Sequence, residues 1–217
     1  WPEMCSKAGM VSVHFVNTSG MGNLVAPYGA VERRLSANPI AVGVPTQGDF
    51  PLILDMSACT IAEGKIRVAL HAGKQVPDGC IIDSEGNPTT DPETFYGPPA
   101  GSILPIAGHK GYALSMIIEM MAGALTGGSC TNSERADRLS NGMLSIIMDR
   151  RKLQTENYFF NEVQRYCEYV RSAKLIDESN QILMPGEIEY NTRVKRRVEG
   201  IELSQITIDM IQDTCDS

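Results

Sequence analysis

The chain has 217 residues, of which 26 are Asp or Glu and 19 are Lys or Arg, so its formal net charge is −7. This acidic balance argues against nucleic-acid binding, which needs clustered cations to neutralise phosphates. The length and the hydrophobic fraction of 42% suffice for a globular core and argue against a disordered chain.

The first half of the chain mixes strand and helix patterns. Residues 1–8 look like the middle of an amphipathic helix, so we expect that the chain is truncated at its N-terminus. Hydrophobic alternation and short apolar runs predict strands at residues 10–16, 39–44 and 52–54, the last two buried, and helical spacing predicts a helix at residues 60–71. We interpret His14 in the first strand and His71 at the helix end as structural residues. Six prolines between residues 73 and 107 predict a long ordered loop or a pair of turns.

The second half is predicted to be mainly helical. An almost wholly apolar run predicts a buried helix over residues 110–125. The later patterns predict a strand at residues 142–148, an amphipathic helix at 157–171, a charged helix at 187–199 and a last helix that Ser204 could cap. The alternation predicts the α/β class, with a mixed sheet flanked by helices. We expect residues 1–150 to form the α/β core and residues 151–217 to complete the same fold as a C-terminal helical segment.

Several common kinds of site are argued against by the sequence. The Rossmann fingerprint, the P-loop, the hydrolase elbow and the zinc-protease motif are absent. The six cysteines lack metal-ligand spacing, so we expect no metal site, and their number predicts reduced thiols in a cytoplasmic protein. The longest apolar stretch, residues 111–128, is glycine-rich and interrupted by Glu119, so we expect no membrane span.

The segment Gly108-His109-Lys110-Gly111 is the first candidate site. Glycine permits close approach of a ligand to the backbone, and a helix N-terminus with an added cation favours a polyanion. The alternative is an ordinary loop whose His and Lys side chains point to solvent. Both interpretations stay open at the level of sequence.

A second candidate follows a predicted strand, in Asp55-Met56-Ser57-Ala58-Cys59. A carboxylate at a strand end can accept hydrogen bonds from ribose hydroxyls. Alternatively, Asp55 or Ser57 caps the next helix. The Pro185-Gly186-Glu187 turn has no role that the residues alone reveal. The basic run from Arg193 to Arg197 is interpreted as a solvated helix face.

These segments together resemble the malate/L-lactate dehydrogenase family, the type 2 family that is unrelated to Rossmann enzymes of similar name. The most distinctive likeness is Gly108-His109-Lys110-Gly111-Tyr112-Ala113-Leu114 running into Met121–Gly127. Further matches follow in the same order along nearly the whole chain: Asn38–Ala41, Asp55–Ser57, Ala62–Lys65, Asp83 through Gly86 to Pro92, Pro185–Glu187, and Gly200-Ile201 with Leu203.

The resemblance implies a non-classical dinucleotide-binding fold, NAD or NADP as cofactor, a 2-oxo or 2-hydroxy acid as substrate, and a homodimer. The resemblance and the two candidates above predict a cofactor site at Asp55, Met56, Ser57, Ala58, Cys59, His109, Lys110, Asn141, Gly186, Glu187, Ile188 and Glu189. We expect His109 and Lys110 to begin the buried helix and to face a cleft that Asp55 also lines.

Three departures from the family pattern bear on activity. Ala37 replaces the usual Thr near the substrate, Ser57-Ala58-Cys59 replaces Ala-Thr-Ser, and Lys65 stands where some members have an Asp relay partner. No histidine of this chain matches the family's proton donor, which the resemblance places upstream, so we expect this fragment alone to be inactive. The alternative hypothesis is a truncated or degenerate chain that only binds a cofactor or partner.

Overall fold

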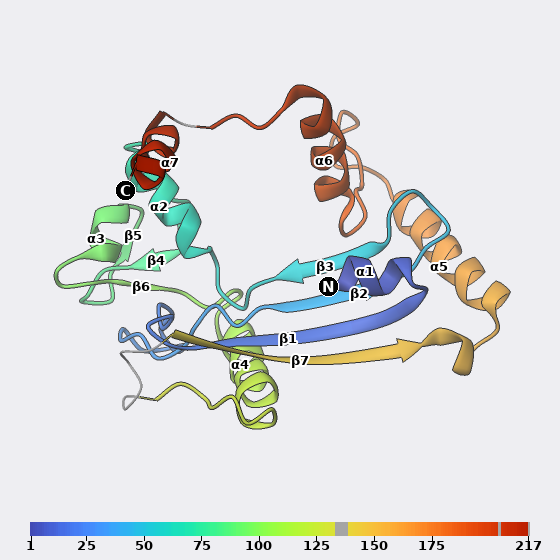
Figure 1. The fold of residues 1–217 in the computed structure, drawn as a ribbon, viewed down its shortest axis with the longest axis horizontal. Helices are drawn as coiled ribbons and strands as arrows, with labels where there is room; N and C mark the ends of the chain where they lie inside the picture. Colours follow the sequence, from blue (N-terminus) through green and yellow to red (C-terminus); the bar gives the residue numbers. More distant parts are fainter. Residues whose placement is uncertain (133–138, 204, 217) are drawn as a thin grey trace.

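The computed structural model describes residues 1–132, 139–203 and 205–216 (Figure 1). Its two β-sheets and their flanking helices confirm the α/β class. The elements in chain order are α1 (Pro2–Lys7), β1 (Met10–Gly20), β2 (Ile40–Val44), β3 (Leu52–Met56), α2 (Glu63–His71), β4 (Ile81–Ile82), β5 (Pro88–Thr89), α3 (Pro92–Tyr96), β6 (Ser102–Ile103), α4 (His109–Glu119), the π-helix η1 (Met120–Ala124), β7 (Leu139–Asp149), the 3₁₀ turn η3 (Arg150–Lys152), α5 (Glu156–Arg171), α6 (Glu187–Glu199) and α7 (Gln205–Asp216). Within the described residues, no helix has the length and apolar character needed to cross a membrane.

The larger sheet has four strands in the order β3-β2-β1-β7, and each neighbouring pair is antiparallel. The expected mixture of parallel and antiparallel strands is therefore not found between the named strands; the parallel contact is an isolated bridge from Val25 to Ile103. β2 and β3 are antiparallel because the short connection between them leaves no room for the helical crossover that a parallel pair needs. β1 continues past its predicted end at Val16 because its whole length pairs with β7.

The hydrophobic core lies beside the smaller sheet, not inside the larger one. The segment 73–107, expected to be a loop, instead forms the three-stranded sheet β5-β4-β6 and the short helix α3. Its Ile81, Phe95 and Ile103 are buried together with Ile66 of α2. The prolines do not prevent this, because the strands have only two residues each and Pro92 stands in the first turn of α3, where it is tolerated.

Helices α1 and α4 cover opposite faces of the larger sheet. Gly43 pairs with Ser12, and a Cβ atom on Gly43 would lie 2.6 Å from the backbone oxygen of Pro2 in α1. Asn17, five positions after Ser12 and thus on the other face, donates to Glu119 of α4. Asp55, Ala41, His14 and Ser145 pair in one row across the four strands, so all four lie on the α1 face.

Two burial predictions are wrong. β2 and β3 are strands, but β3 lies at the sheet edge and its Leu54 and Asp55 are exposed. The helix predicted at residues 110–125 is buried along one face only: Ile117 is 55% and Leu125 67% exposed. An apolar composition does not bury every face of a helix when only one side contacts the sheet.

Other predictions hold. His14 is buried between Ser12 and Ser145, with 3.0 and 2.8 Å hydrogen bonds, and its pKa is lowered by burial. His71 ends α2, as expected. The predicted apolar face of α5 is its more covered face, comprising Phe160, Val163, Cys167 and Val170. Ser204, the predicted cap of the last helix, lies outside the described residues.

Candidate functional site

The edge strand β3 forms the base of the candidate site. The backbone N–H of Ile53 donates to the oxygen of Pro185 at 3.0 Å, so the Pro185–Glu187 turn docks on the free edge of the sheet. Gly186 has φ +89°, and a Cβ atom there would lie 3.1 Å from that of Ile53. Only glycine combines this backbone conformation with this close approach, which explains the Pro-Gly-Glu sequence.

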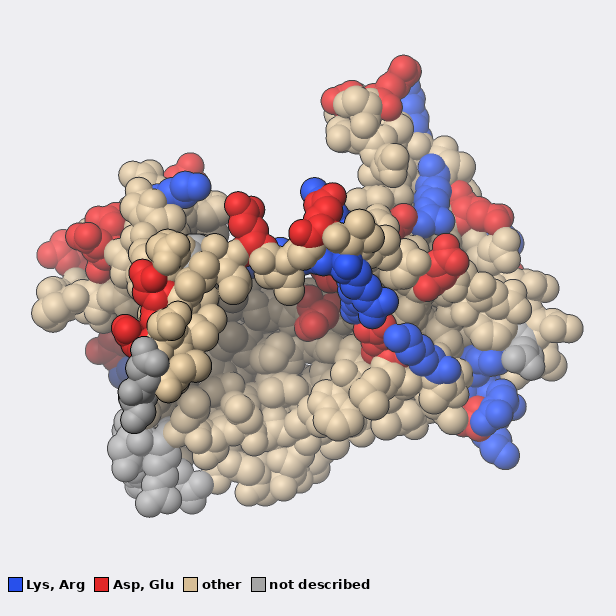
Figure 2. Space-filling model, turned by 45° about the horizontal axis from the view of Figure 1, so that its top comes forward, with Lys and Arg blue, Asp and Glu red and all other residues tan. Residues whose placement is uncertain are grey.

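A cleft of about 710 Å³ opens between α1, β3 and α6. Asp55 lines it, and so do Gly186, Ile188 and Glu189 of the predicted cofactor set. The predicted strand-end and turn segments, 130 positions apart in sequence, are thus brought together. The face drawn in Figure 2 is hollowed at its centre, with acidic and basic side chains next to each other on its right-hand side.

Glu187 does not line this cleft, although its neighbours do. Its carboxylate accepts the backbone N–H of Met184 at 2.8 Å and pairs with Arg171 of α5 at 2.9 Å. These contacts lower the pKa of Glu187, with the Met184 hydrogen bond as the largest cause. Glu187 therefore holds the turn and α5 together.

A second cavity, of about 610 Å³, continues on the other side of Asp55. Met56, Ser57 and Cys59 line it. The Cys59 thiol is buried, which raises its pKa, and it donates to the Ser57 hydroxyl at 3.3 Å. The alternative that Asp55 or Ser57 caps α2 is wrong, because the cap position is Ala62 and it makes no side-chain hydrogen bond.

His109 begins α4, as predicted, and Lys110 follows it in the first turn. Gly108 precedes them with φ +61° and provides no side-chain cap. The N–H groups of Lys110 and Gly111 donate instead to the backbone oxygens of Ala107 and Ile106, at 3.4 and 2.9 Å. Both side chains are exposed, and the His109 ring makes an edge contact with Tyr28. Neither residue lines the two cavities that Asp55 lines; Ile106 lines the second cavity in that segment.

The His109 segment is nevertheless tied to the end of β3. The N–H of Ile106 donates to the oxygen of buried Ala58 at 3.0 Å, and Cys59 forms a bridge with Pro105. Ala58 in turn donates to the oxygen of Ala37 at 2.9 Å. The predicted Asp55–Cys59 and Gly108–Gly111 segments are therefore neighbours in space.

Asn141 lies on the same sheet face as Asp55 but far across it. It pairs with Thr18, whose hydroxyl donates to its side-chain oxygen at 2.8 Å. Three strand spacings and four residues along the strands separate Asn141 from Asp55, which is roughly 19 Å. Only an extended ligand could touch both residues.

A buried polar network fastens α4 beneath this end of the sheet. The carboxylate of Glu119, 8% exposed, accepts from Asn17 at 3.0 Å, from Asn38 at 2.9 Å and from the N–H of Thr131 at 2.8 Å. Asn17 also accepts the N–H of Gly142, next to Asn141. The one charged residue in the apolar stretch is thus the residue that orients the helix bearing His109.

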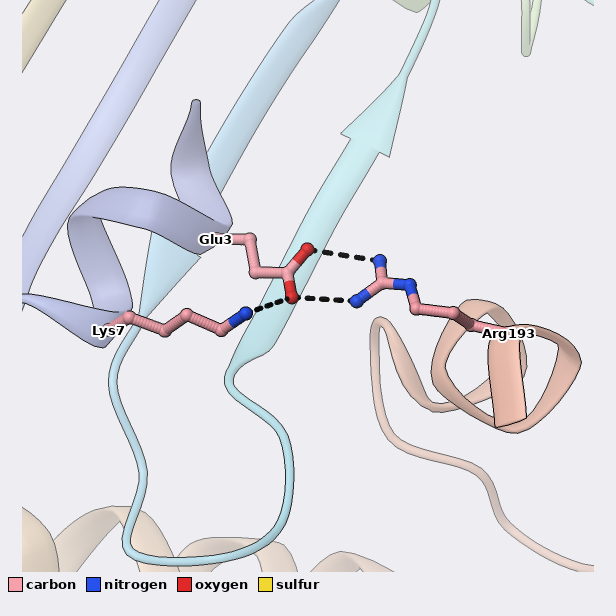
Figure 3. Close-up of polar contacts among 3 residues, drawn as sticks. All are labelled: Glu3, Lys7 and Arg193. Carbon is pink, nitrogen blue, oxygen red and sulfur yellow. Dashed lines mark hydrogen bonds and ion pairs between the residues drawn. The ribbon is translucent and has the colours of Figure 1, made fainter. Parts of the chain in front are cut away.

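The sequence did not single out a charged group that lines the first cleft. Glu3 of α1 forms a two-pronged pair with Arg193 of α6, at 2.7 and 3.0 Å, and a 2.8 Å ion pair with Lys7 (Figure 3). These contacts lower the pKa of Glu3 to about 2, the Arg193 hydrogen bond contributing most. The i,i+4 spacing of Glu3 and Lys7 was the available signal, but nothing local indicates a partner 190 positions away.

Comparison with known proteins identifies the class. The sequence profile of the malate/L-lactate dehydrogenase family matches residues 1–212, so the chain belongs to this family, as its motifs indicated.

The chain is similar to hydroxycarboxylate dehydrogenase B of Escherichia coli (strain K12), with 41% identity over 207 residues, covering 94% of this chain and 56% of the relative. It is 35% identical to L-sulfolactate dehydrogenase of Methanothermobacter thermautotrophicus over 216 residues, which are 97% of this chain and 60% of that protein. A solved E. coli structure, provisionally described as a malate/lactate dehydrogenase, superposes with a TM-score of 0.91 at 40% identity and covers 98% of this chain and 60% of its own. The chain thus spans between 56% and 60% of the length of these relatives.

Proposed function

We propose that this chain is the cofactor-binding part of an oxidoreductase that transfers a hydride between NAD(H) or NADP(H) and a 2-oxo or 2-hydroxy acid. The single observation that carries the proposal is the cleft along β3, where Asp55 and the docked Pro-Gly-Glu turn meet in a chain of this family. The named relatives act on hydroxycarboxylates and L-sulfolactate, which supports a small 2-hydroxy acid as the substrate class.

The donors and acceptors along β3 suit a nicotinamide dinucleotide. Gly186 leaves the backbone next to Ile53 without a Cβ atom in the way. Asp55 can accept hydrogen bonds from a ribose diol. The first turn of α6 carries Glu187 and Glu189, whereas that of α4 carries no acidic residue and has the cation Lys110. The diphosphate therefore suits the α4 end, where Lys110 and the helix dipole favour negative charge.

When bound, the nicotinamide supplies or accepts the hydride. The chain's own residues bind and orient the cofactor. Asp55, Gly186, Ile188 and Glu189 hold it against β3, and His109 and Lys110 face its phosphates. Ser57, Cys59 and Asn141 complete the proposed contacts. Reduction of a ketone also needs a positioned acid, and we propose that a histidine outside this chain provides the proton.

The remaining parts of the proposal concern the whole protein. We propose that residues 151–217 complete the same fold as residues 1–150, because α6 lines the cleft together with β3. A cytoplasmic homodimer is the assembly that we expect.

Calorimetric titration of the intact protein with NADH and NADPH tests the proposal, followed by an assay of nicotinamide oxidation with a panel of 2-oxo acids. Submillimolar binding of either nucleotide and turnover of at least one 2-oxo acid are expected. Binding without turnover would favour the alternative of a non-catalytic chain, and absence of binding at millimolar nucleotide would refute the cofactor site.

A further inference from the structure

The α1–α6 end of the cleft has the composition of a nucleoside pocket. Phe50 and Tyr190 form one wall, with ring centroids 5.2 Å apart, and Leu54 and Ile188 add apolar surface. Flat aromatic walls bind a purine by stacking, and ligand sites combine such walls with few polar groups. The proposed diphosphate site at α4 lies at the other end of β3, which leaves this end for the adenosine half.

Charged residues of both signs surround this pocket. Its lining includes the cations Lys7, Arg193 and Arg197 and the carboxylates Glu3, Asp49, Asp55 and Glu189. Tyr190, Arg193, Val194 and Arg197 recur at helical spacing, so one face of α6 presents the two arginines to the cleft. The carboxylates outnumber the cations by one.

Two of those three cations already hold an anion. The Glu3 carboxylate lies between the Lys7 ammonium and the Arg193 guanidinium and uses both of its oxygens on Arg193 (Figure 3). Arginine forms the same planar, bidentate hydrogen bonds with a phosphate as with a carboxylate. With its pKa lowered to about 2, Glu3 stays ionised throughout the physiological range.

Resting on the proposed function, we propose that Glu3 sets the coenzyme preference of this site to NAD(H) over NADP(H). The two nicotinamide coenzymes differ by the 2′-phosphate of the adenosine ribose, which brings a charge of about −2 that needs cationic partners. The Glu3 carboxylate already pairs with Lys7 and Arg193, so these two cations are not available to a phosphate. The carboxylates of Asp55 and Glu189 repel an additional anion. Removal of the Glu3 charge would turn Lys7 and Arg193 into a 2′-phosphate site.

Dissociation constants for NADH and NADPH, measured by calorimetry at fixed ionic strength, test this inference in the intact protein. The wild-type protein should bind NADH about tenfold or more tightly than NADPH, a difference of about 1.4 kcal/mol. In Glu3→Gln, NADPH affinity should rise about tenfold while NADH affinity changes by less than about threefold, since only NADPH carries the 2′-phosphate. The double variant E3Q/R193Q should lose the gain.

Glu162→Gln is the matched control, because Glu162 also pairs with an arginine, Arg165, but lies on α5 away from this cleft. It should change neither constant. Wild-type binding of NADPH as tight as that of NADH would overturn the inference, and this readout needs no variant. Equal weakening of both coenzymes in E3Q would show that Glu3 only ties α1 to α6, and would overturn it as well. Absence of binding by both coenzymes would instead refute the proposed function itself.

Discussion

Replacement of Glu119 by alanine should strongly destabilise the protein. The buried carboxylate accepts hydrogen bonds from Asn17, from Asn38 and from the N–H of Thr131. Truncation leaves these three donors without their acceptor. An unsatisfied buried donor costs about 1–3 kcal/mol. Asn38 retains its bonds to the oxygen and hydroxyl of Ser115, at 3.1 Å each, and Asn17 retains its bond to the oxygen of Ser129 at 3.3 Å, so the three losses do not each reach the full cost. We therefore expect a loss of about 3–5 kcal/mol.

Glu119→Gln provides the graded control. Its amide oxygen can still accept from Asn17 and Thr131, while its amide nitrogen faces the Asn38 donor. One contact of the three is lost, so we expect a cost of about 1–2 kcal/mol. Asn38→Ala combined with Glu119→Ala should cost less than the two single changes together, because both remove the same bond.

Equilibrium urea unfolding measures these changes, and thermal melts provide a second readout. At about 2–4 °C per kcal/mol for a chain of this size, the alanine variant should melt about 6–20 °C lower. A loss below about 1 kcal/mol in Glu119→Ala, or equal losses in the alanine and glutamine variants, would refute the reasoning that this network fastens α4 to β1 and to the segment just before β2.

Three further predictions concern the ligand segments. His109→Ala should raise the cofactor dissociation constant at least about tenfold, or 1.4 kcal/mol. It should leave the urea midpoint unchanged because the side chain is exposed. An unchanged dissociation constant with a large stability loss would show that His109 is structural. Gly186→Ala should weaken cofactor binding and cost about 1–2 kcal/mol of stability, since φ is +89° and the added Cβ would crowd Ile53. Melting and binding like those of the wild type would contradict the docked-turn geometry. Gly73→Ala is the control, because Gly73 also has a positive φ but lies in open space. The folded-state pKa of Glu3, about 2, lies below its ordinary value of 4.5. The ion pair of Glu3 therefore stabilises the fold above pH 4.5, and this stabilisation is lost as the pH falls toward 2. The stability difference between wild type and Glu3→Gln should shrink between pH 5 and pH 3, and a constant difference would argue against the pair.

Local pattern was sufficient for the main strands and helices. Alternation and helical spacing located β1, β2, β3, β7 and the helices α2, α4, α5 and α6, because the periods of 2.0 and 3.6 residues are properties of each segment alone. The family motifs selected segments that the fold brings together around β3. Gly186 and Asp55 illustrate this, since a positive-φ turn and a strand-end carboxylate can both be recognised from neighbouring residues.

Pairings between distant residues were decided only by the tertiary structure. The proline-rich segment 73–107 contributes part of the core because its two-residue strands pair with one another across turns, which composition does not encode. The exposure of Ile117 follows from which side of α4 meets the sheet. Glu119 and Glu3 acquire their partners across 102 and 190 positions of sequence. Periodicity shows that a side chain lies on a face, whereas the identity of the group opposite that face depends on how the chain closes in space.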